Sequence, residues 1–280
     1  MAQPTPPQTS SQLQVSFPIP HAILLTLNRP ASRNAMTPEM EADIARIMDW
    51  FEQEEDLWVA IFTGAGKIFC SGADLVAWNK RQASGNKTEK DHALGWRYNG
   101  FASLSTRQSR KPWIAAVNGG AHGGGMEVVL NCDLVVASQE ALFTLPEVKR
   151  GVVAFAGGIP RVARVAGHQL ASEMLLTGAT ITAQDAYSRF HFVNKIVPKE
   201  DVLAEALKMA ERIVACSPDA VQSTKSALLL VQQTGSVGQA FTDHINSAVS
   251  DRVFKGENIK EGLKAFTEKR EPRWTPPAKL

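Results

Sequence analysis

Apolar residues along this 280-residue chain follow two patterns, and the change between them falls near Gly151. Before Gly151, short apolar runs indicate buried strands, and apolar positions three or four residues apart indicate helices between them. After Gly151 helical spacing predominates, so the chain predicts an α/β core followed by a helical C-terminal part. The predicted strands are 22–27, 57–62, 113–117, 134–137, 141–145 and 193–197, and the predicted helices are 38–52, 92–108, 169–176, 183–187, 202–216, 218–232 and 237–266, with a further helix that starts at the glycines 123–125.

Composition and charge exclude several classes of protein. The chain is 44% hydrophobic and 21% charged, and its formal net charge of +2 argues against a surface that binds nucleic acid. No apolar run approaches the roughly 18 residues needed to cross a bilayer, so no membrane partner is expected. Cys70, Cys132 and Cys216 are odd in number and widely spaced, which indicates neither a disulfide framework nor a zinc site. Buried thiols in a reducing compartment are expected.

The two ends of the chain differ from the part between them. Residues 1–14 begin with a stretch rich in Pro, Gln, Thr and Ser that has no signal-peptide features, and they predict a disordered tail. The last residues, Ala278-Lys279-Leu280, are a conservative variant of the Ser-Lys-Leu peroxisomal address, and Pro276-Pro277 is expected to keep them extended and accessible. They predict a peroxisomal location and the peroxisomal import receptor as a partner. The predicted organisation is a tail at 1–14, a core at 15–200, a helical region at 201–275 and a targeting tail at 276–280.

A glycine stretch, Gly123-Gly124-Gly125-Met126-Glu127, follows the predicted strand 113–117 and a turn at 118–120. Glycines at a helix start leave backbone N–H groups open, and a helix N-terminus favours negative charge. We interpret the stretch as a place where main-chain donors hold a ligand oxygen, with Glu127 one turn further on. By itself, the stretch is equally consistent with a tight turn in which Glu127 is an ordinary first-turn acid.

A second loop with a glycine, Ser71-Gly72-Ala73-Asp74-Leu75, offers the N–H of Ala73 at a junction between loop and helix. A thioester oxygen that becomes an enolate needs two converging donors, and one such donor is typically worth about 2.7–4 kcal/mol. We therefore hypothesise that the two glycine loops act as a pair.

Two acids have a spacing that suits acid–base chemistry. Glu127 lies on the first turn of its helix, and Glu147 follows the predicted strand 141–145. The chain between them runs out along a helix and a strand and then returns, which would bring Glu147 near Glu127. Paired carboxylates around one substrate carbon can hold a water, take its proton and deliver another. Two solvated surface acids remain the alternative.

Rival motifs do not fit. His122-Gly123-Gly124-Gly125 is similar to the oxyanion element of lipases and esterases, but the chain has no G-x-S-x-G nucleophile motif to accompany it. Residues 64–67 resemble the end of a P-loop, but Ile68 replaces the required Ser or Thr, and Ile61 stands where the first Gly belongs. The chain also has no G-x-G-x-x-G fingerprint, so a dinucleotide-binding fold is not indicated.

These motifs resemble those of the crotonase (enoyl-CoA hydratase/isomerase) superfamily over nearly the whole chain, from about residue 22 to residue 274. Seven blocks stand in the family's order, which is far more specific than any single block. The blocks are Leu27-Asn28-Arg29-Pro30 with Asn34-Ala35-Met36, Phe69 to Leu75, Ala116 to Glu127, Asn131-Cys132-Asp133, Phe143 to Glu147 with Gly151, Gly157-Gly158, and Glu261 to Arg270. The resemblance implies a spiral of ββα turns over 15–200 and a C-terminal helical region that assembles homotrimers or, as dimers of trimers, homohexamers.

The resemblance also implies roles for individual residues. It implies an acyl-CoA thioester held in an oxyanion hole, whose donors match the N–H groups of Ala73 and Gly124. The two hydratase acids match Glu127 and Glu147. Coenzyme A is part of the substrate, and no metal or separate cofactor is implied. The residues at positions that contact the CoA substrate are Arg33, Ser71, Ala73, Asp74, Leu75, Phe266 and Lys269, the last two at the adenine end and often across a subunit boundary.

The chain departs from the family pattern at several positions. The usual Pro-Gly that follows the Gly151 block is Ala154-Phe155 here, next to the acyl pocket, which leaves the length or branching of the acyl group open. Ala31 replaces the usual Lys or Glu, so part of the phosphate contact is expected to fall to Arg33. The aromatic residues that are candidates for the pocket lining, and that fit ordinary packing equally well, are Trp78, Trp96 and Phe101.

The sequence therefore predicts a hydro-lyase that adds water reversibly to a trans-2-enoyl-CoA and gives a 3-hydroxyacyl-CoA. Glu127 and Glu147 are expected to hold the water together, with Glu147 as the acid at Cα. Three alternatives stay open. They are a double-bond isomerase that uses Glu147 alone, a specialised hydratase or dehydratase for a short branched acyl-CoA of a fungal secondary-metabolite or siderophore pathway, and a binding or scaffold protein without catalysis.

Overall fold

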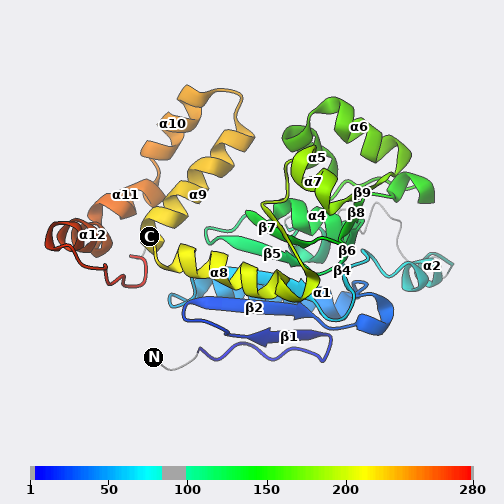
Figure 1. Ribbon diagram of the computed structural model, residues 1–280, viewed down its shortest axis with the longest axis horizontal. Coiled ribbons are helices and arrows are strands. Elements are labelled where there is room, and N and C mark those ends of the chain that lie inside the picture. Colours follow the sequence, from blue (N-terminus) through cyan, green and yellow to red (C-terminus); the bar gives the residue numbers. More distant parts are fainter. Residues whose placement is uncertain (1–3, 84–98, 279–280) are drawn as a thin grey trace.

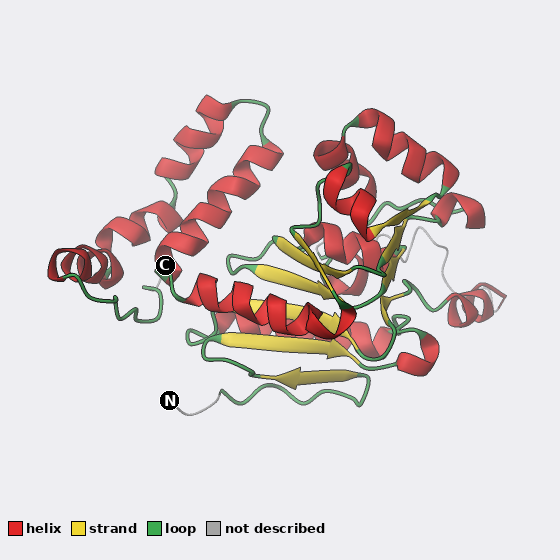
Figure 2. Cartoon of the chain, in the orientation of Figure 1, coloured by secondary structure: helices red, strands yellow, loops and turns green. Residues whose placement is uncertain are grey.

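The computed structural model describes residues 4–83 and 99–278, and its strands form two sheets surrounded by helices (Figures 1 and 2). The six-stranded sheet has the order β1 (Leu13–Ser16), β2 (Ala22–Leu27), β3 (Val59–Gly64), β5 (Trp113–Val117), β7 (Leu134–Ser138) and β10 (Lys195–Val197). The four-stranded sheet has the order β4 (Ile68–Cys70), β6 (Gly120–His122), β8 (Leu142–Thr144) and β9 (Thr180–Thr182).

The helices fall into a group around the sheets and a group that projects to one side (Figure 1). The first group is α1 (Pro38–Gln53), α2 (Leu75–Ala83), α4 (Gly124–Asn131), α5 (Gly158–Ala166), α6 (His168–Thr177), α7 (Ala183–Ser188) and α8 (Val202–Val214). The second group is α9 (Pro218–Gln233), α10 (Val237–Ile245), α11 (Ala248–Lys255) and α12 (Glu257–Glu268). The 3₁₀ turns are η1 (Pro30–Ser32), η2 (Phe101–Ser103), η3 (Glu147–Arg150) and η4 (Lys199–Asp201).

Three ββα units follow one another along the chain. In each unit, a strand of the six-stranded sheet leads into a strand of the four-stranded sheet and then into a helix, as in β3–β4–α2, β5–β6–α4 and β7–β8–α5. The strands β3, β5 and β7 pair in parallel, and so do β4, β6 and β8. This arrangement confirms the spiral core that the family resemblance implies.

The central strands of the six-stranded sheet are buried on both faces, as is usual for parallel strands. Along β3, Ala60 and Phe62 belong to the larger apolar core, whereas Val59 and Ile61 pack with α8 in a smaller one. The helix α8 therefore belongs with the sheets, although it falls in the range 201–275 that the sequence predicts as a separate helical region. The helices that project away from the sheets begin at α9 (Figure 1).

The N-terminal part is more ordered than the predicted tail at 1–14. Strand β1 begins at Leu13, which is 1% exposed, and pairs antiparallel with β2. Before it, the N–H of Ser10 donates a hydrogen bond of 2.8 Å to Asp43 on α1. The disorder prediction was wrong for these residues because it weighed composition alone, whereas an added edge strand satisfies the backbone hydrogen bonds of β2.

Two predicted helices differ from the structure. The prediction for 92–108 lies partly outside the described residues, and the described part forms only the short turn η2, because Ala102 and Ser103 take positive φ values of 57° and 55°. The predicted helix 237–266 is divided into α10, α11 and α12. The first break occurs where the Ser247 side chain caps α11 by accepting the N–H of Ser250, and the second occurs at Gly256.

The end of the described chain is attached to the projecting helices. The side-chain amide of Asn258 donates to Thr275 O at 3.0 Å, and the N–H of Ala278 donates to Asp219 at 3.2 Å. Asp219 is buried and lies 3.1 Å from the guanidinium of Arg252. Across the described residues, we find no helix with both the length and the apolar character required to cross a membrane.

Candidate active site

The residues of the predicted site follow the carboxyl ends of three neighbouring strands. Strands β4, β6 and β8 are adjacent and parallel, so the segments that leave them start at one edge of the four-stranded sheet. The loop with Ala73 follows β4, the glycine stretch follows β6, and Glu147 follows β8. Crevices at the carboxyl ends of parallel strands are common ligand sites in α/β proteins.

The glycine stretch forms a sharp entry into α4. Gly123 takes φ 55° and ψ −129°, a conformation that favours glycine, and its N–H donates to Thr144 O on β8 at 2.9 Å. Gly124 is the first residue of the helix, where a backbone N–H has no acceptor within the helix. No hydrogen bond from the Gly124 N–H reaches any acceptor in the described ranges.

The second loop presents the Ala73 N–H on the same side. The N–H of Met36 donates to Gly72 O at 2.9 Å, and the N–H of Asp74 donates to Met36 O at 3.2 Å. In such a parallel bridge the residue between them, Ala73, turns its own N–H away from Met36. Among described groups the Ala73 N–H likewise has no acceptor.

The two loops are in direct contact. Gly72 has φ 90°, and a Cβ placed on it would lie 2.9 Å from His122 O and 3.4 Å from the nitrogen of Gly124. The structure therefore brings together the two N–H groups that the sequence predicts as a pair.

Glu127 is buried one turn into α4, with 4% of its surface exposed. Its Oε1 accepts the N–H of Gly158 at 3.0 Å. Burial raises its pKa to about 7, and the nearby Glu147 adds to this rise, while the hydrogen bond from Gly158 opposes it. The predicted surface alternative for Glu127 is therefore wrong.

Glu147 lies beside Gly123, because its Oε1 would be 3.2 Å from a Cβ placed on that glycine. Burial raises the pKa of this carboxyl also. Its Oε2 is buried and has no hydrogen-bond partner among the described residues. A buried polar atom without a partner needs an explanation in a native structure, and a catalytic role is one such explanation.

The pKa of Glu127 has a measurable consequence for stability. Because this carboxyl stays protonated in the folded state up to a pH near 7, while an ordinary Glu ionises near 4.5, folding loses stability as the pH rises between these values. Glu127→Gln removes this loss and keeps an oxygen for the Gly158 N–H. The free energy of unfolding of the variant is expected to equal that of the wild type near pH 4.5 and to exceed it by up to about 3 kcal/mol at pH 8.

Urea unfolding of both proteins across this pH range measures the difference. Glu140→Gln is a matched control because Glu140 is exposed. A difference in the free energy of unfolding between Glu127→Gln and the wild type that is the same at all pH values would contradict the pKa assignment.

One cavity of about 100 Å³ unites the predicted residues. Its lining includes both donors, both acids, and the predicted CoA-contacting residues Ser71 and Leu75, together with the predicted aromatic residues Trp78 and Phe101. Trp96, the third predicted aromatic residue, lies outside the described residues. Phe155, which the sequence predicts next to the acyl pocket, lines the cavity too. Further lining residues that the sequence does not single out are Pro146, Arg150, Val152, Val153 and Ala156.

The other predicted CoA-contacting residues are not gathered at the cavity. Asp74 accepts the N–H of Ala77 at 3.1 Å, so it caps α2, and it lies 3.5 Å from Arg29. Arg33 is exposed next to the second loop, where its carbonyl accepts the N–H of Ser71 at 3.1 Å. Phe266 and Lys269 lie at α12, at the opposite end of the molecule from α2 (Figure 1).

The role of the Gly158 N–H was also missed. Gly157-Gly158 belongs to a sequence block typical of the family, but two glycines followed by Pro160 indicate a loop more than a helix. In the structure they begin α5, and the proline is tolerated because it lies in the first turn. Among the described residues, no His, Cys, Asp and Glu side chains gather in a group of three or more that would hold a metal ion.

The ββα spiral, with two open amides, the buried acid Glu127 and the half-buried acid Glu147 at one sheet edge, defines an enzyme of the crotonase fold. The model of the enoyl-CoA hydratase/isomerase family matches residues 21–277. The mevalonyl-coenzyme A hydratase sidH of Aspergillus fumigatus is 44% identical over 94% of this chain and 94% of that protein. The mevalonyl-coenzyme A hydratase SIDH of Beauveria bassiana is 43% identical over 96% of each chain. Among solved structures, an enoyl-CoA hydratase from Mycobacterium tuberculosis has a TM-score of 0.84 and 33% identity, over 95% of this chain and 100% of that one.

The chain therefore belongs to the enoyl-CoA hydratase/isomerase family. It is a hydro-lyase that acts on CoA thioesters, and the alternative of a non-catalytic binding protein is set aside.

Proposed function

We propose that the physiological substrate is a short acyl-CoA branched at Cβ, of the mevalonyl-CoA type, which the enzyme hydrates and dehydrates reversibly through Glu127 and Glu147. One observation carries the assignment of these residues: both acids and both open amides line a single cavity. The proposed identity of the acyl group is supported by the two relatives above, which are named for mevalonyl-CoA. Relatives named for other hydratase substrates are less similar, for example the 2,3-dehydroadipyl-CoA hydratase of Escherichia coli at 35% identity.

The first catalytic element is the oxyanion hole. The thioester oxygen of the substrate accepts the N–H groups of Ala73 and Gly124, which have no other acceptor among the described residues. When water adds to Cβ, the electrons of the double bond move to the thioester, and its oxygen becomes an enolate oxygen. The two donors stabilise this charge more strongly than they stabilise the neutral carbonyl of the substrate.

The second element is the pair of acids, and burial raises the pKa values of both carboxyls, that of Glu127 to about 7. In the reactive form Glu127 is ionised and its Oε1 accepts the N–H of Gly158, while Glu147 is protonated at its unpartnered Oε2. Glu127 takes a proton from water as the water oxygen bonds to Cβ, and Glu147 gives its proton to Cα. A proton exchange between the acids restores the starting state.

A comparison of substrates tests this proposal. Purified enzyme would be given crotonyl-CoA, a long straight trans-2-enoyl-CoA, and 5-hydroxy-3-methylpent-2-enoyl-CoA, the dehydrated form of mevalonyl-CoA, and loss of the conjugated thioester absorbance would be followed. The highest kcat/KM is expected for the branched ester. A strong preference for straight chains would contradict the proposed acyl group but leave the acid pair intact, whereas no turnover of any ester would contradict both.

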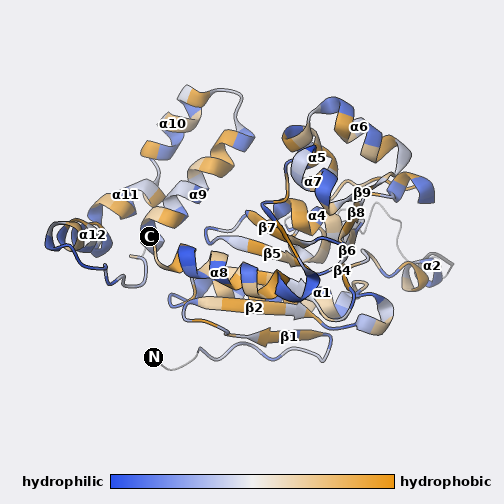
Figure 3. Cartoon of the chain, viewed as in Figure 1, coloured by the Kyte–Doolittle hydropathy of each residue, from blue (hydrophilic) through white to orange (hydrophobic). Residues whose placement is uncertain are grey.

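Association of several chains is also part of the proposal, as a homotrimer or homohexamer. Large apolar side chains on the projecting helices are exposed in the single chain, and Figure 3 shows hydrophobic positions recurring along these helices. Among them is Phe266, 84% exposed, which together with Lys269 would reach a CoA adenine only in a neighbouring subunit. Sedimentation equilibrium is expected to give a mass of three or six 30.4-kDa chains. A monomer would contradict the assembly. Other exposed apolar residues in this group are Leu228, Val231, Phe241, Phe254 and Leu263.

We also propose that Ala278-Lys279-Leu280 directs the enzyme to peroxisomes through the import receptor. The support is the sequence of the tripeptide, of which Lys279 and Leu280 lie outside the described residues. A fluorescent protein fused to the N-terminus of the full chain is expected to coincide with a peroxisomal marker, and deletion of 278–280 is expected to disperse it. A full chain that is dispersed in the same cells would contradict this location.

A further inference from the structure

One side chain stands between the catalytic cavity and a larger cleft. The cleft has a volume of about 650 Å³ and is lined by the end of α4, by α5 and by α9. The catalytic cavity, at about 100 Å³, is much smaller. Of all residues in the described ranges, only Phe155 lines both spaces. Its ring therefore forms part of the wall between them.

The segment that carries Phe155 has alternating exposure. Ala154 and Ala156 are buried, whereas Val153 is 54% and Phe155 47% exposed. The backbone is held from the buried side, because Ser105 Oγ donates to Ala156 O at 2.6 Å. Substitutions of Val153 and Phe155 that change side-chain size are therefore expected to leave the packing of Ala154 and Ala156 in place.

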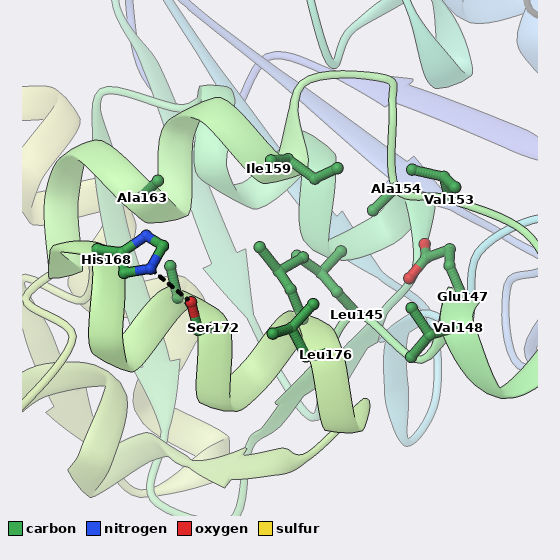
Figure 4. A pocket seen from close by; sticks show the side chains of 12 residues that line it. Leu145, Glu147, Val148, Val153, Ala154, Ile159, Ala163, His168, Ser172 and Leu176 are labelled. Carbon is green, nitrogen blue, oxygen red and sulfur yellow. Dashed lines mark hydrogen bonds between the residues drawn. The ribbon is translucent and has the colours of Figure 1, made fainter.

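Val153 borders the cavity on a different side. Val153 and Glu147 line both this cavity and an apolar groove of about 370 Å³ between η3, α5 and α6. Figure 4 shows Val153 and Glu147 at one end of this groove and His168 at the other. Since Glu147 must face the reacting carbons, the groove is partly closed by a side chain that the reaction requires.

We propose that Phe155 ends the acyl cavity and thereby restricts the enzyme to short acyl groups. This inference rests on the proposed function, because it explains why a short branched ester would be preferred. A straight chain that extends beyond a few carbons meets the Phe155 ring, and among the described residues the space behind that ring is the cleft. The cleft walls include Val129, Leu130 and Phe192, apolar surface against which a longer chain would pack once the ring is removed.

Two alanine variants on the same segment test the proposal. Phe155→Ala joins the cavity to the cleft, and Val153→Ala, the matched control, widens it only toward the groove. For each enzyme, kcat/KM is measured for trans-2-decenoyl-CoA and for crotonyl-CoA, and their ratio is compared with that of the wild type. The ratio is expected to rise at least tenfold in Phe155→Ala and by less than threefold in Val153→Ala. Phe155→Leu keeps more of the side-chain volume and is expected to give an intermediate ratio. It replaces the alanine variant in the test if that variant does not fold.

The possible outcomes separate this inference from the proposed function. An unchanged ratio in folded Phe155→Ala and Phe155→Leu would overturn the role of Phe155. A larger rise in Val153→Ala would overturn it also, because the groove would then be the route of long chains. If the wild type turned over no enoyl-CoA at all, the proposed function itself would fail. A wild-type enzyme that already prefers the decenoyl ester would contradict both the acyl group and the restriction.

Discussion

Replacement of Glu147 by Gln is expected to lower kcat for hydration of crotonyl-CoA by about 10²–10⁴-fold, the range that a positioned general acid contributes. Gln has the shape of the acid but has no proton of suitable acidity to give to Cα. Binding should change little, because in the proposed mechanism the amides of Ala73 and Gly124 hold the thioester oxygen. The dissociation constant of butyryl-CoA, which has no double bond to hydrate, is expected to stay within about threefold of the wild-type value.

Two comparisons make this experiment specific. Glu140→Gln changes an exposed acid on the same stretch of chain and should leave kcat unaltered. Glu127→Ala should also be severely impaired in hydration, whereas an isomerase that depends on Glu147 alone would tolerate it. Full hydratase activity in Glu147→Gln would remove this residue from the mechanism.

Gly72→Ala is expected to lower kcat by about 10²–10³-fold, as the loss of one oxyanion donor does. The new Cβ would lie 2.9 Å from His122 O, closer than carbon and oxygen approach without displacement, and 3.4 Å from the nitrogen of Gly124. It would push the two loops apart, so that the amides of Ala73 and Gly124 no longer converge on one oxygen. Steady-state kinetics with crotonyl-CoA measures the effect.

The effect of backbone strain alone must be distinguished from the effect of the added Cβ on the distance between the two loops. Gly167, between α5 and α6, has φ 80°, but a Cβ added to it would meet nothing within 4 Å. Gly167→Ala therefore introduces strain without contact, and it should lose stability while retaining most of its kcat. Similar losses of kcat in the two variants would indicate that strain, and not the approach of the loops, is responsible.

The candidate site could be predicted largely because its residues have unusual backbone requirements. Gly72 and Gly123 have positive φ values next to another loop, and glycine at such positions is visible in the sequence. Glu127 and Glu147 could be paired because the chain between them runs out along a helix and a strand and then returns, and in the structure each acid follows one of two adjacent parallel strands. The strands β4, β6 and β9 have only three residues each, too few to show an alternating pattern, so the repeated ββα unit was not visible from the pattern of apolar residues.

Other features depend on tertiary contacts that no local pattern reports. Ala102 and Ser103 turn the chain at η2 with positive φ, although neither residue favours that conformation. The exposure of Phe155 and the burial of Ala154 follow from the way their segment lies on Glu127 and Ser105, residues far away in the sequence. The sequence shows that Ala154-Phe155 departs from the family pattern, but the position of Phe155 in the cavity wall can be seen only in the folded structure.

The attachment of the chain end has a practical consequence for how the protein is produced. Ala278 donates its N–H to Asp219, which is buried beside Arg252, and only two residues follow it in the sequence. An affinity tag added after Leu280 would thus start almost at this contact, and it would also cover the tripeptide that we propose as an import signal. The tag belongs before the N-terminus, where, from residue 4 onward, the first backbone hydrogen bonds to α1 are those of Gln8 and Ser10.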